Sequence, residues 1–272
     1  MASKDPQAQN GNTVKSYFAG LTIIVLFIVA FIIYKFVLGN PANFEGGDPA
    51  GHPLKDNYLG VVYKGGIIVP VLLTFLLMVL TFSIERFVTL QRANGSGSID
   101  AFVRKIKSLL ASGNISAAKA ECDRQKGSVG NVTRSVLTKY ESISEETHMA
   151  KDQKILAIQK ELEDSTALEL PMLEKNLTII ATLASVATLV GLLGTVLGMI
   201  KAFSALANAG APDTAGLSTG ISEALINTAL GIGTSALAII AYNFFTSKID
   251  TLTYSIDEVG FSIMQNFGAT KN

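Results

Sequence analysis

The chain has 272 residues, and its 22 basic and 22 acidic side chains give a formal net charge of zero. A mean hydropathy of +0.39 places it among integral membrane proteins, and the neutral charge balance argues against a nucleic-acid partner. Cys122 is the only cysteine, so an intrachain disulfide and a cysteine metal cluster are excluded. Because His52 and His148 are far apart in the sequence, we predict no metal site and no cofactor.

Four apolar runs are long enough to cross roughly 30 Å of hydrocarbon at about 1.5 Å per residue, so we predict four transmembrane helices. They cover residues 15–38, 66–90, 175–201 and 217–247. The apolar core of the first run exceeds the roughly 7–15 residues of a signal peptide, and no A-x-A cleavage pattern follows it. We therefore expect this helix to be retained, and the predicted fold class is an all-α integral membrane protein.

The distribution of basic residues predicts the orientation of these spans. Most lysines and arginines lie between the second and third spans, whereas residues 39–64 contain only Lys55 and Lys64. The positive-inside rule places the basic segment in the cytoplasm, with both chain termini on the same side. The predicted segments are a cytoplasmic tail over 1–14, a periplasmic loop over 39–65, a cytoplasmic helical domain over 91–174, a periplasmic link over 202–216 and a cytoplasmic tail over 248–272. Prolines and glycines predict a loop, not a domain, for residues 39–65.

The cytoplasmic segment is predicted to form helices. Apolar residues recur at helical spacing before Gly113, and Asn114 is a suitable N-cap for the helix that follows. The predicted helices cover residues 99–110, 115–125, 129–141 and 145–174. Pro171 marks a kink or a restart in the last of these helices, close to the third span. Cys122 is predicted to be a buried packing thiol.

The third and fourth spans carry matching stripes of small and hydroxylated residues. The spacing alternates between four and three residues, which puts each set on one face of its helix. The stripes are Ala184, Thr188, Gly191, Thr195 and Gly198 on the third span, and Ala224, Thr228, Gly231, Ser235 and Ala238 on the fourth. Close approach of two helices predicts packing roles for the glycines, which are Gly191, Gly194, Gly198 and Gly231. Two interpretations remain open: simple helix–helix packing, or a polar-lined interior.

Glu223 is the only charged residue between Asp213 and Lys248. A carboxylate inside a span is costly and normally faces a bundle interior or a wet cavity. The alternative is a carboxylate at the outer end of its helix that reaches the lipid headgroups. Lys201, at the end of the third span, is predicted to be an interfacial anchor and not a pore residue.

Three stretches of the chain resemble a known family. Residues 189–199, with the sequence LVGLLGTVLGM, and Phe203 resemble the second core helix of the ExbB/TolQ/MotA proton-channel family. Residues 220–231, with the sequence GISEALINTALG, resemble the third core helix of its ExbB/TolQ branch, and residues 113–122 are similar to its short cytoplasmic helices. The resemblance covers residues 66–247. The chain departs from the family at residues 187–189, where a proline is common, and in having a fourth span in addition to the usual three.

The resemblance implies an assembly and a site. Members form a homopentamer around a dimer of single-span ExbD- or TolR-like subunits, which occupies the central pore and carries the essential aspartate. Thr195 and Thr228 match the lumen-facing threonines of the family, and Glu223 matches its transmembrane glutamate. These three residues are the expected proton pathway. The implied location is the inner membrane of a Gram-negative bacterium, as a multi-pass protein in contact with membrane lipid and with a TonB-like protein.

The implied function is a proton-channel and motor subunit that converts proton motive force into mechanical work and energises TonB-dependent outer-membrane transport. A TolQ-like subunit for envelope maintenance and a flagellar- or gliding-type stator subunit are alternatives within the same class. A non-conducting membrane scaffold is an alternative from a different class. No H-E-x-x-H or G-x-S-x-G motif and no paired carboxylates are present, so we do not expect an enzyme.

Overall fold

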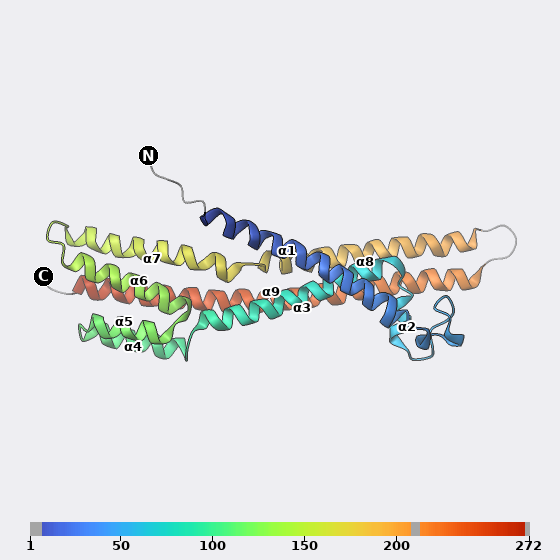
Figure 1. The fold of residues 1–272 in the computed structure, drawn as a ribbon, viewed down its shortest axis with the longest axis horizontal. Coiled ribbons are helices and arrows are strands. Elements are labelled where there is room, and N and C mark those ends of the chain that lie inside the picture. The colour runs from blue at the N-terminus through green and yellow to red at the C-terminus, as the bar shows by residue number, and fades with distance from the viewer. Residues whose placement is uncertain (1–6, 208–212, 270–272) are drawn as a thin grey trace. The chain divides into compact units, whose positions relative to one another are not determined.

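The computed structural model of the chain describes residues 7–207 and 213–269, and the side chains of this part from Gly20 onward (Figure 1). Within this part the regular secondary structure is helical, apart from one isolated β-bridge between Phe44 and Pro53. Four runs are long and apolar enough to cross a membrane. They include α1 (Gln7–Ile32) with the π-helical turn Ile33–Leu38, α3 (Val69–Asn94), α8 (Leu177–Leu206) and α9 (Thr214–Ala269). The predicted all-helical fold with four candidate spans is therefore confirmed.

The contacts divide the chain into two compact units. The first unit contains the residues up to Ser83 together with Ile179–Ala241, and the second contains Ile84–Thr178 together with the residues from Tyr242. Both α3 and α9 contribute to each unit. The first unit holds most of the apolar spans, and the second holds the helices that the sequence predicts for the cytoplasm.

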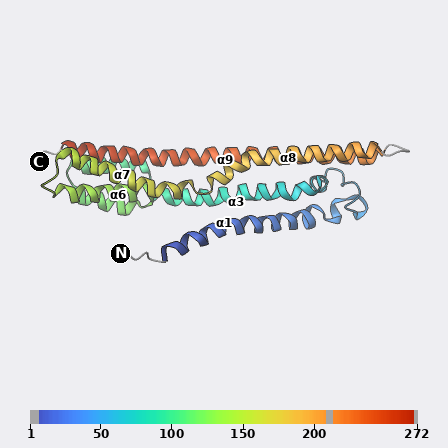
Figure 2. The ribbon, with the colours of Figure 1, turned by 90° about the horizontal axis from the view of Figure 1, so that it is seen from above.

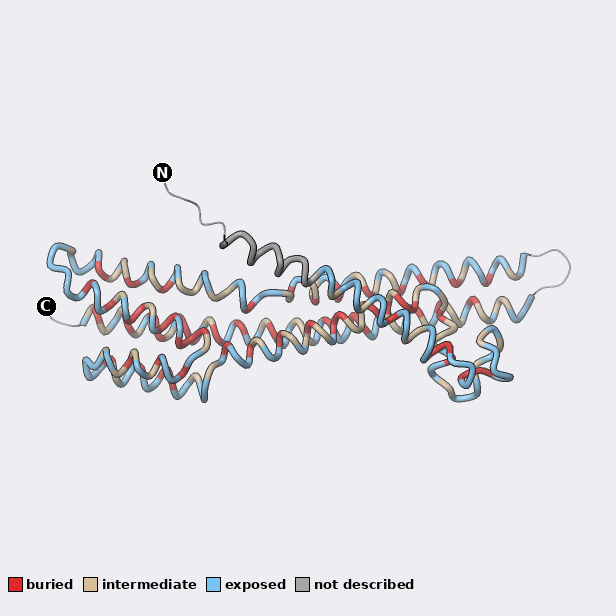
Figure 3. The backbone as a smooth tube through the Cα atoms, viewed as in Figure 1, coloured by how far each residue is buried: buried red, intermediate tan, exposed pale blue. Residues whose placement is uncertain are grey.

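In the first unit, α8 and α9 run side by side, and Figure 2 shows α1 on the side of α3 that faces away from α9. Only 11% of the apolar stretch Gly20–Leu38 is buried, and Figure 3 shows this stretch as largely exposed. The exposed side chains are large and apolar, and include Leu21, Ile24, Phe27, Ile28 and Phe31. Such a surface suits contact with lipid tails.

The segment predicted as a periplasmic loop folds into short helical turns. These are 3₁₀ turns at Pro41–Asn43 and Glu45–Gly47 and the helix α2 (Tyr58–Tyr63), and a further 3₁₀ turn at Gly66–Ile68 leads into α3. The Asn43 side chain joins this segment to the end of the first span through hydrogen bonds. Its Nδ2 donates to the carbonyls of Val37 and Leu38 at 2.8 and 2.9 Å, and its Oδ1 accepts from Asn57 at 3.1 Å.

In the second unit, four helices follow α3: α4 (Ile99–Ala111), α5 (Ile115–Gln125), α6 (Gly127–Ser144) and α7 (Lys151–Glu174). Asn114 caps α5 as predicted, because its Oδ1 accepts from the Ala117 N–H at 3.0 Å. The last helix begins six residues later than the predicted residue 145. Its start is fixed at Ala150, whose N–H donates to the Gln153 side chain at 3.2 Å.

Of the two alternatives predicted at Pro171, a kink or a restart, the restart is excluded because Pro171 lies inside α7. The chain leaves the helix at Lys175, and the left-handed backbone of Asn176, with φ of 64°, leads into α8. Arg86 supports this end of α7. Its side chain is buried, and one guanidinium nitrogen donates to the carbonyls of Met172 and Leu173 at 3.0 and 3.1 Å. These carbonyls lie in the last turn of a helix, where intrahelical partners are lacking.

The segment predicted as a cytoplasmic tail from residue 248 is helical, because α9 continues without a break to Ala269. Its C-terminal part has an apolar face that recurs every three or four residues and is buried in the second unit. The buried side chains are Ile249, Leu252, Ile256, Val259, Ile263 and Phe267. The charged residues between them, such as Asp250, lie on the other faces of the helix. The predicted link over 202–216 is likewise shortened at both ends, since α8 extends to Leu206 and α9 begins at Thr214.

Candidate functional site

The glycines of the two stripes lie where α8 and α9 touch. A Cβ on Gly198 would lie 2.7 Å from the backbone nitrogen of Ala224, and one on Gly231 would lie 2.7 Å from the carbonyl oxygen of Ala187. Gly191 faces Gly231 in the same way, and Gly194 packs against the side chain of Asn227. The two backbones are therefore too close for any side chain at these positions. Within one chain, the small residues of the stripes face each other.

Thr195 and Thr228 lie at the edge of this contact, and their hydroxyl groups hydrogen-bond to each other. Each hydroxyl also lies near a carbonyl of its own helix, at 3.3 Å from Gly191 for Thr195 and at 3.2 Å from Ala224 for Thr228. Both threonines are only half-buried. Thr195 borders an open and mostly apolar groove on α8, lined by Val196, Met199, Ile200, Phe203, Ser204 and Ala207. A partner helix in this groove could reach the hydroxyl pair.

Glu223 is paired with Lys201. The two side chains approach to 2.8 Å between Lys201 Nζ and Glu223 Oε2, and they are 60% and 12% exposed, respectively. The pair therefore holds one oxygen of a largely covered carboxylate against the lysine amine. Glu223 is five residues from Thr228, or about 7.5 Å along the helix axis, and no hydrogen bond among the described residues joins it to either threonine.

Asn227 completes the site and was missed by the sequence analysis. It is fully buried, its Nδ2 donates to the carbonyl of Gly65 at 2.9 Å, and its Oδ1 has no partner among the described residues. A buried amide inside an apolar span is a signal that the sequence contained. Its partner could not be predicted, because the two residues are 162 positions apart.

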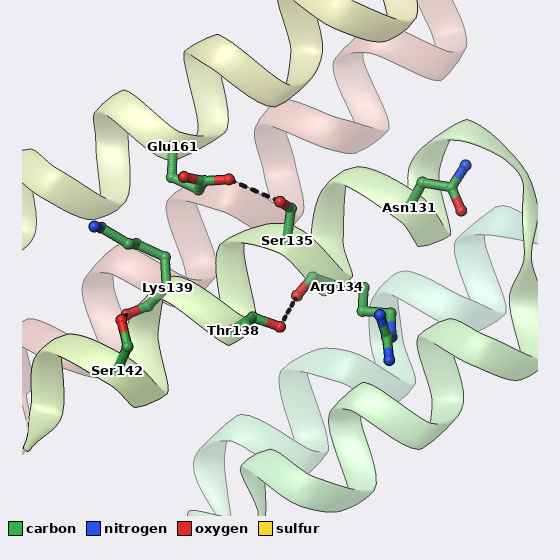
Figure 4. A pocket seen from close by; sticks show the side chains of 7 residues that line it. All are labelled: Asn131, Arg134, Ser135, Thr138, Lys139, Ser142 and Glu161. Atoms are coloured by element: carbon green, nitrogen blue, oxygen red, sulfur yellow. Dashed lines mark hydrogen bonds between the residues drawn. The ribbon is translucent and has the colours of Figure 1, made fainter. Parts of the chain in front are cut away.

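Figure 4 shows a second hollow, between α6 and α7, that is lined by polar side chains. Several of its side chains already have partners. Ser135 donates to Glu161 at 2.7 Å, Thr138 donates to the carbonyl of Arg134 at 2.8 Å, and Arg134 pairs with Asp123 at 2.6 Å. This hollow is an open cleft, and the structure gives it no argument for a ligand.

Two further features bear on chemistry. Among the described residues, no group of three His, Cys, Asp or Glu side chains could hold a metal ion. Cys122 is buried in α5, and burial raises the pKa of its thiol to about 12. A thiol that stays protonated at neutral pH is a packing group and not a nucleophile.

The part of the chain that carries the hydroxyl pair, Glu223 and Asn227 also has known relatives. Residues 131–258 match the MotA/TolQ/ExbB proton channel family. The predicted resemblance is therefore confirmed, and the match includes both α8 and most of α9.

Individual relatives agree with this assignment. The chain is 39% identical to an ExbB-like biopolymer transport protein of Synechocystis, over 32% of this chain and 42% of the relative. It is 38% identical to the Tol-Pal system protein TolQ of Haemophilus influenzae, over 31% and 37%. It is 43% identical to the biopolymer transport protein ExbB of Helicobacter pylori, over 35% and 64%. In each case the match spans less than two thirds of the relative's own length.

Proposed function

We propose that this chain is the channel-forming subunit of a proton-driven motor that works with an ExbD- or TolR-like single-span partner in the inner membrane. The observation that carries the proposal is the hydroxyl pair Thr195–Thr228, which borders an open apolar groove within the family-matching segment. Glu223 lies five residues before Thr228 on the same helix. The multi-pass apolar helices support a location in a membrane.

Threonine hydroxyls suit the task of passing a proton to a partner carboxylate. Each hydroxyl can donate one hydrogen bond and accept others, so the pair can solvate a proton without holding a fixed charge. A fixed charge at this position would trap the proton. The driving force is adequate, since one charge that crosses 100 mV releases about 2.3 kcal/mol.

The assembly in this proposal is a homopentamer with a partner dimer in its centre. The exposed apolar face of α8, which includes Val196, Ile200 and Phe203, is the surface on which a single-span partner helix would pack. The exposed face of α1 then lies toward lipid at the periphery. Because two partner carboxylates cannot match five subunits at once, alternating protonation would step the partner around the ring.

The process that the motor energises has two candidates. TonB-dependent outer-membrane transport fits the ExbB relatives, and envelope maintenance through a Tol-Pal system fits the TolQ relatives, at comparable identities. A flagellar- or gliding-type stator is a further alternative, although the region over 91–174 is short for it. The tight glycine contact between α8 and α9 is what a non-conducting scaffold would also need.

Threonine variants test the proposal. Thr195→Val and Thr228→Val keep the side-chain shape and remove the hydroxyl, so they should abolish energised function while the complex still assembles. Thr195→Ser and Thr228→Ser are the matched controls and should retain partial activity. Uptake of a TonB-dependent substrate and resistance to detergent, in strains that lack the native gene, separate the two candidate processes. Pull-down of the partner checks assembly. Full activity of both valine variants in both assays would leave the stripes as packing surfaces only.

A further inference from the structure

We call residues 63–66, the turn before α3, the entry turn. It contacts α9 at two residues that are one helical turn apart, Glu223 and Asn227. Gly66 has a left-handed backbone, with φ of +75°, and packs directly against the Glu223 carboxylate, so no side chain fits there. One helical turn further along α9, Asn227 donates to the carbonyl of Gly65 at 2.9 Å. The entry turn therefore covers one side of Glu223, while Lys201 pairs with the carboxylate.

The opposite side of the entry turn is held by residues 33–62, which we call the N-terminal cap. The rings of Tyr34 and Tyr63 stack at 4.7 Å between centroids, and Phe44 meets Tyr63 edge-on at 5.4 Å. The Tyr34 hydroxyl also donates weakly to the Tyr63 carbonyl, at 3.4 Å. Aromatic contacts of this kind stabilise beyond their buried area alone.

Lys64 makes a second attachment between the entry turn and the cap. Its Nζ donates to the carbonyls of Pro49 and Ala50 at 3.0 and 2.8 Å, and it lies 5.6 Å from the centre of the Phe44 ring. Burial lowers the pKa of this amine, Asp48 opposes that effect, and Lys201 adds to it. The cap therefore contacts the entry turn in two ways, through the stacked rings and through the hydrogen bonds that it accepts from Lys64.

We propose that the N-terminal cap positions Glu223 by holding the entry turn against α9. The extra first span then does more than anchor the chain in lipid, because the cap begins in its last turn. Asn227 supports this assignment. A buried amide with an unsatisfied oxygen costs stability, and the bond that this amide makes among the described residues is the one to the entry turn. The proposal rests on the proposed function only in giving Glu223 a role.

Chemical labelling of Glu223 tests the proposal without any transport assay. The full chain, purified with its partner in lipid nanodiscs, is treated with a water-soluble carbodiimide and an amine, and mass spectrometry measures modification of the Glu223 peptide. Tyr34→Leu removes the ring stack on the cap side, and Asn227→Leu removes the bond on the α9 side. Tyr58→Leu is the matched control, because Tyr58 belongs to the same cap but is 81% exposed.

Each of the two disruptive variants should raise the labelling rate of Glu223 by about two- to tenfold, which is the change in open population when one hydrogen bond or ring contact is lost. Tyr58→Leu should leave the rate unchanged. Modification of Glu121, a carboxylate outside the cap that is only 15% exposed, serves as an internal reference in the same sample. A merely structural defect would raise the reactivity of both carboxylates and reduce partner binding.

Unchanged labelling of Glu223 in assembled Tyr34→Leu and Asn227→Leu complexes would overturn the proposal. If either variant does not assemble, Lys64→Met provides a milder test, because it removes the two carbonyl bonds and the contact with the Phe44 ring but changes no residue of α9. Unchanged labelling in this variant would overturn the proposal equally. The outcome is separable from the proposed function. Tolerance of Glu223→Gln in the uptake assay would remove the functional role of Glu223 but not its positioning by the cap.

Discussion

The two parts of α9 pack in different ways, although they belong to one continuous helix. The part in the first unit buries small and polar side chains, such as Ala224, Asn227 and Ser235, and the part in the second unit buries large aliphatic ones, such as Ile256 and Ile263. In lipid there is no hydrophobic gain from helix association, so close backbone contact and hydrogen bonds must hold helices together. In water, burial of apolar area is the main driving force. The change in side-chain size along α9 therefore follows the expected change of solvent.

The largest effect is expected in the activity of reporter enzymes fused to the chain at two positions. If the first part of α9 lies in lipid and the second in the cytoplasm, a reporter after residue 50 and one at the C-terminus must be on opposite sides. A periplasm-active enzyme fused at the first position should be active, and the same enzyme at the second should be inactive. Activity at both positions would contradict the assignment of the two parts of α9 to lipid and to the cytoplasm.

Truncating a large side chain in the second part of α9 should reduce stability strongly. Ile256 is only 2% exposed, so Ile256→Ala should cost about 2–5 kcal/mol through lost burial and the cavity left behind. Tyr254→Ala is the control, since Tyr254 is 69% exposed. Thermal unfolding of the purified complex measures both variants. Equal melting temperatures for the two would contradict an aliphatic core in this part.

In the first part of α9, a larger side chain at a small residue should reduce stability. Gly231→Ala places a methyl group against the Ala187 carbonyl and Gly191, and we expect a cost of about 1–3 kcal/mol from overpacking. Gly233→Ala meets no atom within 4 Å and should be neutral or stabilising, because alanine is the better helix former by about 1 kcal/mol. The same unfolding assay compares them, and a tolerated Gly231→Ala would argue against tight contact of α8 and α9.

The smallest expected effect is a difference in stability between alanine variants of two serines of α9. Ser235 donates to the carbonyl of Ala184 on α8, whereas Ser255 donates to Thr251 of its own helix at 2.9 Å. Ser235→Ala should cost about 0.5–1.5 kcal/mol, because it removes a bond between helices. Ser255→Ala should cost less, since a serine that bonds back to its own helix gives that helix little support. A larger loss for Ser255→Ala would mean that hydrogen bonds between helices do not distinguish the first part.

The sequence predicted most helices because their signals are local. The apolar spacing before Gly113 and the cap at Asn114 gave α4 and α5 to within a residue or two. The length of α9 was missed because Lys248 and Asp250 suggest a polar tail, although the apolar spacing from Ile249 to Phe267 was present. A charged helix with one apolar face needs a partner before it can be recognised as buried.

The candidate site was less predictable, because its contacts depend on how separate helices align. Thr195, Thr228 and Glu223 could be named from motif and charge. The pairing of Glu223 with Lys201 depends on the relative register of α8 and α9. The contacts of the entry turn depend on where a distant segment comes to lie, and periodicity carries no information about that. The partner of Asn227 is therefore found only once the fold is known, although the amide itself could have been noticed in the sequence.

The buried guanidinium of Arg86 limits how this protein can be recombined with its relatives. One side chain serves the neighbouring Glu85 at 2.5 and 2.7 Å and two carbonyls of α7, and Asn176 donates to the same carboxylate at 3.1 Å. Only arginine presents five donors in a rigid fork, so lysine cannot replace it. In a chimera, the stretch around Arg86 and the end of α7 must come from the same parent. An exchange point within α5 or α6 would separate Arg86 from the end of α7, whereas an exchange point within α1 or α8 would keep both in the same parent.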